Sequence, residues 1–323
     1  MANPALSNLI NYPKIAKIVA DSWINAAALI RTGVIKRNPF SNQGTYEYTL
    51  RERVFQDATG AATDVGDPIP NTAKVQYEVK FPKLFRQFSY EESVLLQKIE
   101  VKDAVMETVS TVNGIRDAGT QAVDNSLYNI LVGVGAAMDS NQSGTASATV
   151  ALTDFTATMA KLGERGLDLN GGAMVANSQV YWTLLGLGMA TASNNTMGDV
   201  NKNGMVIMGK LPNELLGLSF IMTDKLTAAA TNKYYVYMAG RESLYLYGTE
   251  APELYAGDKF GDRILSTVIN GNVSYGAGFK NVTYGGSFGL KVLDTELATS
   301  ANWTLAAADQ KLVPIARAYV SIA

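Results

Sequence analysis

One apolar periodicity, over residues 101–136, constrains the fold of this chain more than any other feature. Apolar or small residues recur there at spacings of three, four and seven, which places them on one side of an α-helix. No proline occurs between positions 83 and 211, so nothing forces a break. A continuous helix would be about 50 Å long, enough to span a whole domain. The periodic positions are Val101, Val105, Val109, Val112, Gly119, Val123, Leu127, Ile130 and Val134.

Two segments upstream of this helix predict a long β-hairpin. Residues 74–81, KVQYEVKF, alternate apolar and polar side chains strictly, which is the pattern of a half-buried strand. Residues 45–55, TYEYTLRERVF, show a looser alternation, and the Gly-, Pro- and Asp-rich residues 56–72 have turn chemistry. A lone two-stranded hairpin is marginally stable in water, so its apolar face needs a cover. That cover is either the core of the same chain or another copy of the protein. The face comprises Tyr46, Tyr48, Leu50, Val75, Tyr77, Val79 and Phe81.

The chain lacks the side chains that most enzymatic and metal sites use. Its 323 residues include no histidine and no cysteine. Serine–histidine triads, zinc–histidine sites, disulfides and cysteine nucleophiles are therefore excluded. A near match to a calcium-binding loop at 199–210, DVNKNGMVIMGK, has Lys210 where the bidentate glutamate belongs. We expect no catalytic residue, no cofactor-binding residue, no cofactor and no metal site.

Composition places the chain among folded globular proteins. Hydrophobic residues make up 47% and charged residues 17%, the opposite of a disordered chain. A formal net charge of −2 means that the surface as a whole is not built to hold nucleic acid. No stretch approaches the roughly 18 apolar residues of a membrane helix, and the N-terminus lacks the apolar core of a signal peptide. A soluble protein made in a reducing cytoplasm is the expectation.

The first forty residues form a locally basic segment on this acidic chain. They carry five basic residues and a single aspartate, Asp21. Residues 21–33, DSWINAAALIRTG, predict a short helix that ends at a glycine. The segment is either an ordinary N-terminal helix or an arm that faces a polyanion or a neighbouring subunit. The five basic residues are Lys14, Lys17, Arg31, Lys36 and Arg37.

The second half of the chain predicts a mixed α/β region. Residues 153–165 predict a helix capped by Thr153 or Asp154, and residues 233–276 predict short tyrosine-rich strands. Two further segments form a pair: MVANSQVYWTLL at 174–185, a strand followed by a helix, and LLGLSFIMTDKLT at 215–227. This pair fits either a catalytic site or an assembly scaffold.

The order of these elements resembles that of the major capsid proteins of tailed bacteriophages, which have the HK97-like fold. Members often carry an apolar strand, a polar break and a helix, and then a glycine-turned strand that ends in a polar Asp. VANSQVYWTLL and LLGLSFIMTDKL are similar to these two motifs, with Asn177 where many relatives carry a histidine. The resemblance in element order covers most of the chain.

The resemblance implies an α+β fold with named parts. Residues 1–44 would be an N-terminal arm, and residues 45–91 an extended β-hairpin, the E-loop, whose apolar face contacts a neighbouring subunit. Residues 92–165 and about 241–280 would form a peripheral domain with a long spine helix. Residues 166–240 and 281–323 would form an axial domain. The five basic residues of the arm would face DNA.

The function that this resemblance implies is structural. The chain would self-assemble into the icosahedral head shell that encloses phage DNA, in the virion, after assembly in the host cytoplasm. Its partners would be itself as hexamers and pentamers, the portal, scaffolding or decoration proteins, and packaged double-stranded DNA by weak contact, with no membrane. Two alternatives stay open: an encapsulin-type nanocompartment shell and a carbohydrate-active or carbohydrate-binding β-rich protein.

Overall fold

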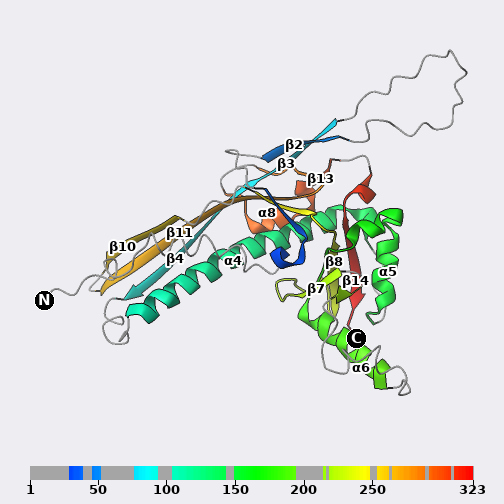
Figure 1. Ribbon diagram of the computed structural model, residues 1–323, viewed down its shortest axis with the longest axis horizontal. Coiled ribbons are helices and arrows are strands. Elements are labelled where there is room, and N and C mark those ends of the chain that lie inside the picture. Colours follow the sequence, from blue (N-terminus) through cyan, green and yellow to red (C-terminus); the bar gives the residue numbers. More distant parts are fainter. Residues whose placement is uncertain are drawn as a thin grey trace, which may run out of the picture.

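The computed structural model describes eleven segments of the chain, and its core consists of one long helix between two β-sheets (Figure 1). Everything below refers to those segments. They are residues 29–38, 46–51, 76–93, 104–142, 149–193, 214–215, 218–247, 253–261, 264–287, 291–306 and 309–322.

Helix α4, Ala104–Ala137, confirms the predicted helix and runs through the molecule as one unbroken rod of 34 residues (Figure 1). Its length is about 50 Å at roughly 1.5 Å per residue. Val123, Leu127, Ile130 and Val134 are fully buried, so the periodic side is the side that meets both sheets. The amide of Gln142 donates to the carbonyls of two residues in the last helical turn, which ends the helix.

The first sheet lies along the N-terminal half of α4 (Figure 1). Its longest strand, β11 (Ile264–Phe279), pairs antiparallel with β4 (Lys83–Ser93), β10 (Glu253–Gly261) and β9 (Leu244–Tyr247). The short β1 (Ile35–Asn38) adds to β9 in parallel.

The side chains of β11 alternate between the two faces of this sheet. Val273, Tyr275 and Ala277 are buried in the same core cluster as α4, as the period of two requires. Opposite Tyr275 on β4 stands Leu84, which is also fully buried in this cluster. The α4 side of the sheet is therefore the apolar side.

The predicted hairpin is confirmed in its two strands. β2 (Tyr46–Arg51) and β3 (Gln76–Phe81) pair antiparallel, from Tyr46 opposite Phe81 to Arg51 opposite Gln76. β3 also contacts β12 (Val282–Tyr284), which pairs with β13 (Trp303–Leu305). The hairpin base thus stands on elements of its own chain.

The second sheet has the order β14–β8–β5–β7–β6. One face packs on α4, and the other is covered by α5 (Leu152–Ala160) and α6 (Ser178–Ser193). The alternation along β8 shows this division, because Tyr237 belongs to the α4 cluster whereas Val236 and Met238 belong to the cluster with α5 and α6. The strands are β14 (Ile315–Ser321), β8 (Lys233–Ala239), β5 (Ala173–Ala176), β7 (Leu218–Met222) and β6 (Glu214–Leu215).

Two helix boundaries differ from the sequence expectation. α5 begins two or three residues earlier than a cap at Thr153 or Asp154 would place it: its N-cap is Ala151, whose N–H donates to the Asp154 carboxylate at 2.9 Å. The helix ends at Ala160, and a 3-10 segment, Gly163–Leu169, follows. In the N-terminal segment, Leu29–Thr32 is a 3-10 turn that ends at Gly33 with φ of 74°, a left-handed conformation that favours glycine. Residues 21–28 lie outside the described residues.

Residues 282–287 and 291–306 pack differently from the expectation that all of 281–323 belongs to the unit of the second sheet. Helix α8 (Asp294–Ala298) and the 3-10 turn Ser300–Asn302 contact α4, and the Trp303 indole donates to the Leu297 carbonyl at 2.7 Å. Among the described residues of 281–323, only those of β14 join the second sheet. The short 3-10 turns Asp139–Asn141 and Gln310–Leu312 lie together where α4 ends.

Candidate assembly surfaces

The base of the hairpin is covered by its own chain. Val79 and Phe81 are fully buried in a cluster with Tyr247 and Ala306. The Phe81 ring centroid lies 6.3 Å from that of Tyr247, whose hydroxyl donates to the Phe81 carbonyl at 3.2 Å. The prediction that a neighbouring copy covers Val79 and Phe81 is therefore wrong.

Two glycines on β11 explain why the chain can cover this base itself. A Cβ added at Gly278 would lie 2.0 Å from the Phe81 ring, and one at Gly276 would lie 2.1 Å from the Tyr247 ring. The rings occupy the space that side chains would otherwise fill, as glycine permits at close approaches. The signal was present in the sequence as alternate glycines in SYGAGF at 274–279.

The other positions of the predicted hairpin face are placed by backbone pairing alone. Tyr48 stands opposite Val79 and Leu50 stands opposite Tyr77, as one apolar face shared by both strands requires. Tyr46 is opposite Phe81 at the base. Val75 lies outside the described residues.

The predicted basic arm falls only partly within the described residues. Lys14 and Lys17 lie outside them, Arg31 belongs to the 3-10 turn Leu29–Thr32, and Arg37 lies in β1. Lys36, also in β1, is exposed, with its Nζ 5.8 Å from the ring centroid of Tyr245 on the paired strand β9. The end of the arm is thus part of the first sheet.

The two paired sequence segments meet in the second sheet. β5 and β7 run parallel and adjacent, and Asn177 follows β5 directly. The Asn177 amide nitrogen donates to the Leu226 carbonyl at 2.6 Å, and its side-chain oxygen accepts from the N–H of Gln179 at 2.9 Å. Both groups of this nearly buried side chain are satisfied by backbone, so Asn177 joins the end of β5 to the start of α6 and to the segment after β7.

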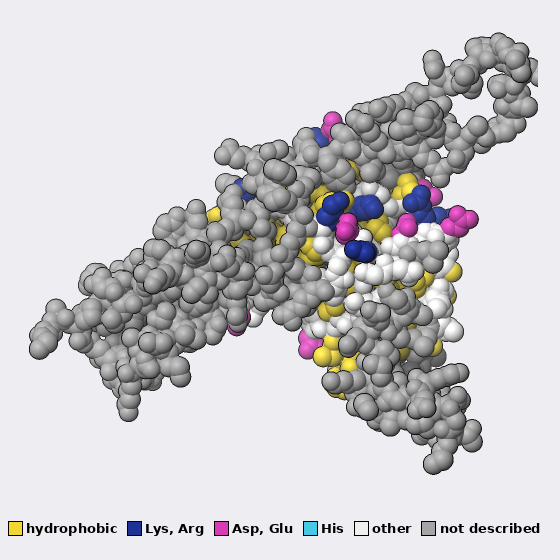
Figure 2. Space-filling model, in the orientation of Figure 1, with side chains coloured by type: hydrophobic (Ala, Val, Ile, Leu, Met, Phe, Trp, Pro, Cys, Tyr) yellow, Lys and Arg dark blue, Asp and Glu magenta, His cyan; other side chains and the backbone are white. Residues whose placement is uncertain are grey.

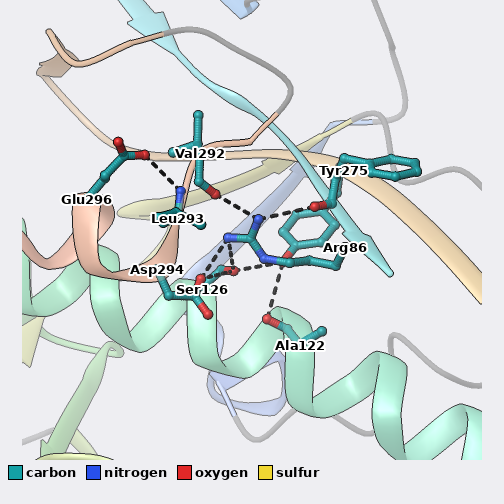
Figure 3. A network of polar contacts seen from close by, with 9 residues as sticks. Arg86, Ala122, Ser126, Tyr275, Val292, Leu293, Asp294 and Glu296 are labelled. Atoms are coloured by element: carbon teal, nitrogen blue, oxygen red, sulfur yellow. Dashed lines mark hydrogen bonds and ion pairs between the residues drawn. The ribbon is translucent and has the colours of Figure 1, made fainter. Parts of the chain in front are cut away.

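A polar network centred on Arg86 ties three parts of the fold together (Figure 3). From β4, the guanidinium donates to Asp294 Oδ1 at 2.7 Å, to the Val292 carbonyl at 2.8 Å and to Ser126 Oγ at 3.2 Å. Ser126, on α4, donates in turn to Asp294 Oδ1 at 2.9 Å. The network fixes the segment before α8 against β4 and the long helix, and sequence reasoning did not single out any of its members.

Tyr275 closes this network from β11. Its hydroxyl lies 2.8 Å from Ser126 Oγ and 3.2 Å from the Ala122 carbonyl (Figure 3). Burial raises the pKa of Tyr275 to about 12, although the neighbouring Arg86 charge and the Ser126 hydrogen bond oppose that shift. The hydroxyl is therefore a permanently neutral donor at physiological pH.

A groove of about 640 Å³ opens beside this network. The exposed side chains of Phe85 and Leu293 flank it, and Leu293 is 58% exposed. The N–H of Leu293 donates to the Glu296 carboxylate at 2.8 Å, which holds the backbone of this segment at the start of α8. The lining residues are Phe85, Arg86, Gln87, Lys291, Val292, Leu293 and Asp294.

On the face shown in Figure 2, the described residues form no large patch of a single charge sign. Basic and acidic side chains lie there among apolar and uncharged ones. Within the described segments, no cluster of three or more acidic side chains could hold a metal ion. The helices in those segments include none that is long and apolar enough to cross a membrane.

Solved structures of phage heads share this fold. A chain of Mycobacterium phage Ogopogo is similar with a TM-score of 0.52 and 14% identity, over 92% of this chain and 92% of that chain. The head structure of Helicobacter pylori bacteriophage KHP40 is similar with a TM-score of 0.52 and 9% identity, over 90% and 88% of the two chains. The capsid of cyanophage Pam1 is similar with a TM-score of 0.50 and 13% identity, over 87% of this chain and 85% of that chain. The fold, of mixed α and β content, is therefore that of phage capsid proteins.

The family profile of major capsid proteins described as Major capsid protein 13-like (Gp13-like) matches residues 45–314. The chain belongs to this family. No curated protein matches it. It is a structural protein that assembles with copies of itself into a capsid shell, and its place is the virion. The nanocompartment and carbohydrate alternatives are not favoured.

Proposed function

We propose that this chain builds the icosahedral head shell that encloses double-stranded phage DNA, as hexamers and pentamers, with an HK97-like division of labour among its parts. α4 would serve as the spine helix, and the hairpin as an E-loop that reaches an adjacent subunit. A shell subunit must bury large areas against identical neighbours, and its contacts are many and modest. Assembly would take place in the host cytoplasm.

One observation carries this proposal: the hairpin is anchored at its base and extends beyond its own core. Val79 and Phe81 are buried at the base, where Thr283 of β12 also donates to the Glu78 carbonyl at 3.0 Å, and Figure 1 shows β2 and β3 along the outer edge of the molecule, away from α4. The pairing continues outward to Arg51 and Gln76. A hairpin held at one end can project toward a neighbour without loss of the subunit fold.

The test is a shortened hairpin. Because Arg51 and Gln76 stand opposite each other, residues 52–75 can be replaced by Asn-Gly, which closes a two-residue turn. We expect a folded subunit, by circular dichroism and thermal melting, that forms no closed shells by negative-stain microscopy. Shells of normal size from this variant would refute the role of the hairpin. A larger deletion of 48–84 would remove Phe81 and Leu84 from the core and would unfold the chain.

The remaining partners follow from the same proposal. The basic arm, with Lys14, Lys17, Arg31, Lys36 and Arg37, would contact packaged DNA weakly, through phosphate charges and without sequence preference. The portal would join the shell at one position, and scaffolding or decoration proteins would be further partners. Charge reversal of Lys36 should lower the packaged DNA content without an effect on empty shells.

A further inference from the structure

The dipeptide Asn–Gly, in which asparagine loses its side-chain amide most readily, occurs four times in the chain. The main-chain nitrogen of the glycine attacks the side-chain carbon of the asparagine, and glycine places no Cβ in the way of the five-membered ring that forms. The fold around each copy decides whether that ring can close. The copies are Asn113–Gly114, Asn170–Gly171, Asn203–Gly204 and Asn270–Gly271, of which 203–204 lies outside the described residues.

Asn170–Gly171 forms the corner of a tight turn between the 3-10 segment Gly163–Leu169 and strand β5. Both residues of the pair are exposed. One main-chain hydrogen bond closes the turn, from the Gly172 N–H to the Leu169 carbonyl at 3.0 Å. The N–H of Gly171, the group that must attack, donates to no other described residue. A surface turn closed by a single bond opens at low cost, so the ring can form there.

The other two described copies are held in regular structure. Asn113–Gly114 lies inside α4, where each main-chain N–H donates to the carbonyl four residues earlier. Asn270–Gly271 lies in the middle of β11, which pairs with β10 on one side and with β4 on the other (Figure 1). Asn270 is exposed, as Asn170 is. Backbone pairing, and not access to water, therefore distinguishes the site in the turn from the site in the strand.

We propose that Asn170 is a modification site at which the chain deamidates spontaneously, while Asn113 and Asn270 keep their amides. The Gly171 nitrogen loses its proton and bonds to Asn170 Cγ, and the side-chain nitrogen leaves as ammonia, so that a succinimide ring remains. One water molecule then opens the ring. Attack at Cγ gives aspartate, and attack at the main-chain carbonyl gives isoaspartate, in which the chain runs through Cβ. The net reaction consumes one water and releases one ammonia.

Both products place a new negative charge on this turn, beside a cationic side chain. A Cβ at Gly171 would lie 3.7 Å from Arg241 Cδ. Isoaspartate also adds one carbon to the main chain just before Gly171 and Gly172. A Cβ at Gly172 would lie 1.9 Å from the Ala239 carbonyl oxygen, so the start of β5 is tightly packed against β8. We therefore expect isoaspartate, unlike aspartate, to strain the second sheet.

Peptide mapping by mass spectrometry tests the site on the full-length chain, aged at pH 7 and pH 9 in water labelled with heavy oxygen. Each conversion introduces one heavy oxygen, so products that predate the incubation are not counted. We expect Asn170 to convert at least about tenfold faster than Asn113 and Asn270. The rate should rise with pH, because the attacking nitrogen must lose its proton. In the chain denatured with guanidinium chloride, all four copies should convert at comparable rates.

Two variants separate the modification from its consequence. Asn170→Gln keeps an amide but would need a six-membered ring, so this position should not convert and the aged chain should keep its Tm. Asn170→Asp carries the charge on an ordinary main chain and should also keep the Tm, whereas the aged natural chain should melt lower as its isoaspartate content rises. Equal conversion of Asn170 and Asn270 in the native chain would overturn the proposal. So would an Asn170 that converts only after denaturation. None of these measurements requires shells, so their outcome is independent of the proposed function.

Discussion

Asn177 and Leu226, 49 positions apart, are joined by a hydrogen bond of 2.6 Å from the side-chain amide to the main-chain carbonyl. This bond links the end of β5 to the segment after β7, where the two paired sequence motifs meet. The same side chain caps α6 through the N–H of Gln179. One residue thereby fixes a strand, a helix start and a loop, which accounts for a polar residue at a nearly buried site.

Replacement of Asn177 should separate these two contacts. Asn177→Ala loses both and should lower the free energy of unfolding by about 2–4 kcal/mol, since a buried carbonyl and a helix N-terminus each lose a partner. Asn177→Ser keeps an acceptor for Gln179 and should cost about half as much. Urea titration measures both values. Equal stability of the alanine variant and the natural chain would show that neither bond contributes.

The Arg86–Asp294 pair should behave as a coupled unit. Arg86→Met leaves a half-buried carboxylate without its cation, and we expect a loss of about 2 kcal/mol, because Asp294 keeps some contact with water. The double variant Arg86→Met with Asp294→Leu should be more stable than the sum of the two single losses implies. A double-mutant cycle in urea gives the coupling. Strict additivity would mean that the pair does not act together.

Two glycines of α4 should respond in opposite ways to alanine. A Cβ at Gly133 would lie 2.1 Å from the Leu297 carbonyl oxygen and 2.6 Å from the Trp303 indole nitrogen, so Gly133→Ala must push α8 away. We expect a loss on the order of 2–4 kcal/mol. Nothing lies within 4 Å of a Cβ at Gly114. Gly114→Ala should therefore raise the free energy of unfolding by about 0.5–1 kcal/mol. Thermal melting of the two variants should therefore shift in opposite directions.

The correction at the hairpin base can be tested on the unassembled subunit. Phe81→Ala should destabilise it by about 3–5 kcal/mol, because the ring fills space against Tyr247 and Gly278 of the same chain. Lys80→Ala, at the adjacent position, removes a solvent-accessible ion pair with Glu78 and should cost far less, about 0–1 kcal/mol. If Phe81→Ala affects shells but not the isolated subunit, the ring is covered by a neighbour after all.

Stability should fall in alkaline solution. Burial raises the pKa of Tyr275 to about 12, and burial also raises the pKa of Tyr237 to about 12 against the opposing effect of Arg317. An unfolded tyrosine titrates near pH 10, so above that pH the unfolded state holds fewer protons than the native state. The stabilisation, about 2–3 kcal/mol per tyrosine, is complete below pH 10 and is lost as the pH rises through 12.

Urea titrations at pH 8 and pH 11 measure this loss. Tyr275→Phe should be less stable than the natural chain at pH 8, where it lacks the bond to Ser126, and should lose less stability between the two pH values. An unchanged slope with pH in this variant would remove Tyr275 as a source of the effect.

Local patterns predicted much of the fold. The apolar periodicity that includes Val123, Leu127, Ile130 and Val134 predicted α4, and strict alternation predicted β3. These patterns work because a helix and a strand each repeat their side-chain direction at a fixed period. The helix cap at Ala151 was missed because alanine has no capping side chain, and the contact that stabilises this end comes from Asp154 three residues later.

The order of residues along the chain is enough to predict which side chains need burial, to exclude histidine and cysteine chemistry, and to suggest the element order of a capsid protein. It does not predict which residues cover each apolar face, and that became known from the folded chain. Val79 and Phe81 pack in one cluster with Tyr247 of β9, and Phe81 also lies against Gly278 of β11, although both strands are far along the chain. Arg86 is likewise bonded to Asp294, 208 positions away. Periodicity specifies the direction of a side chain relative to its own backbone. The partner on that side depends on long-range packing, which no local pattern encodes.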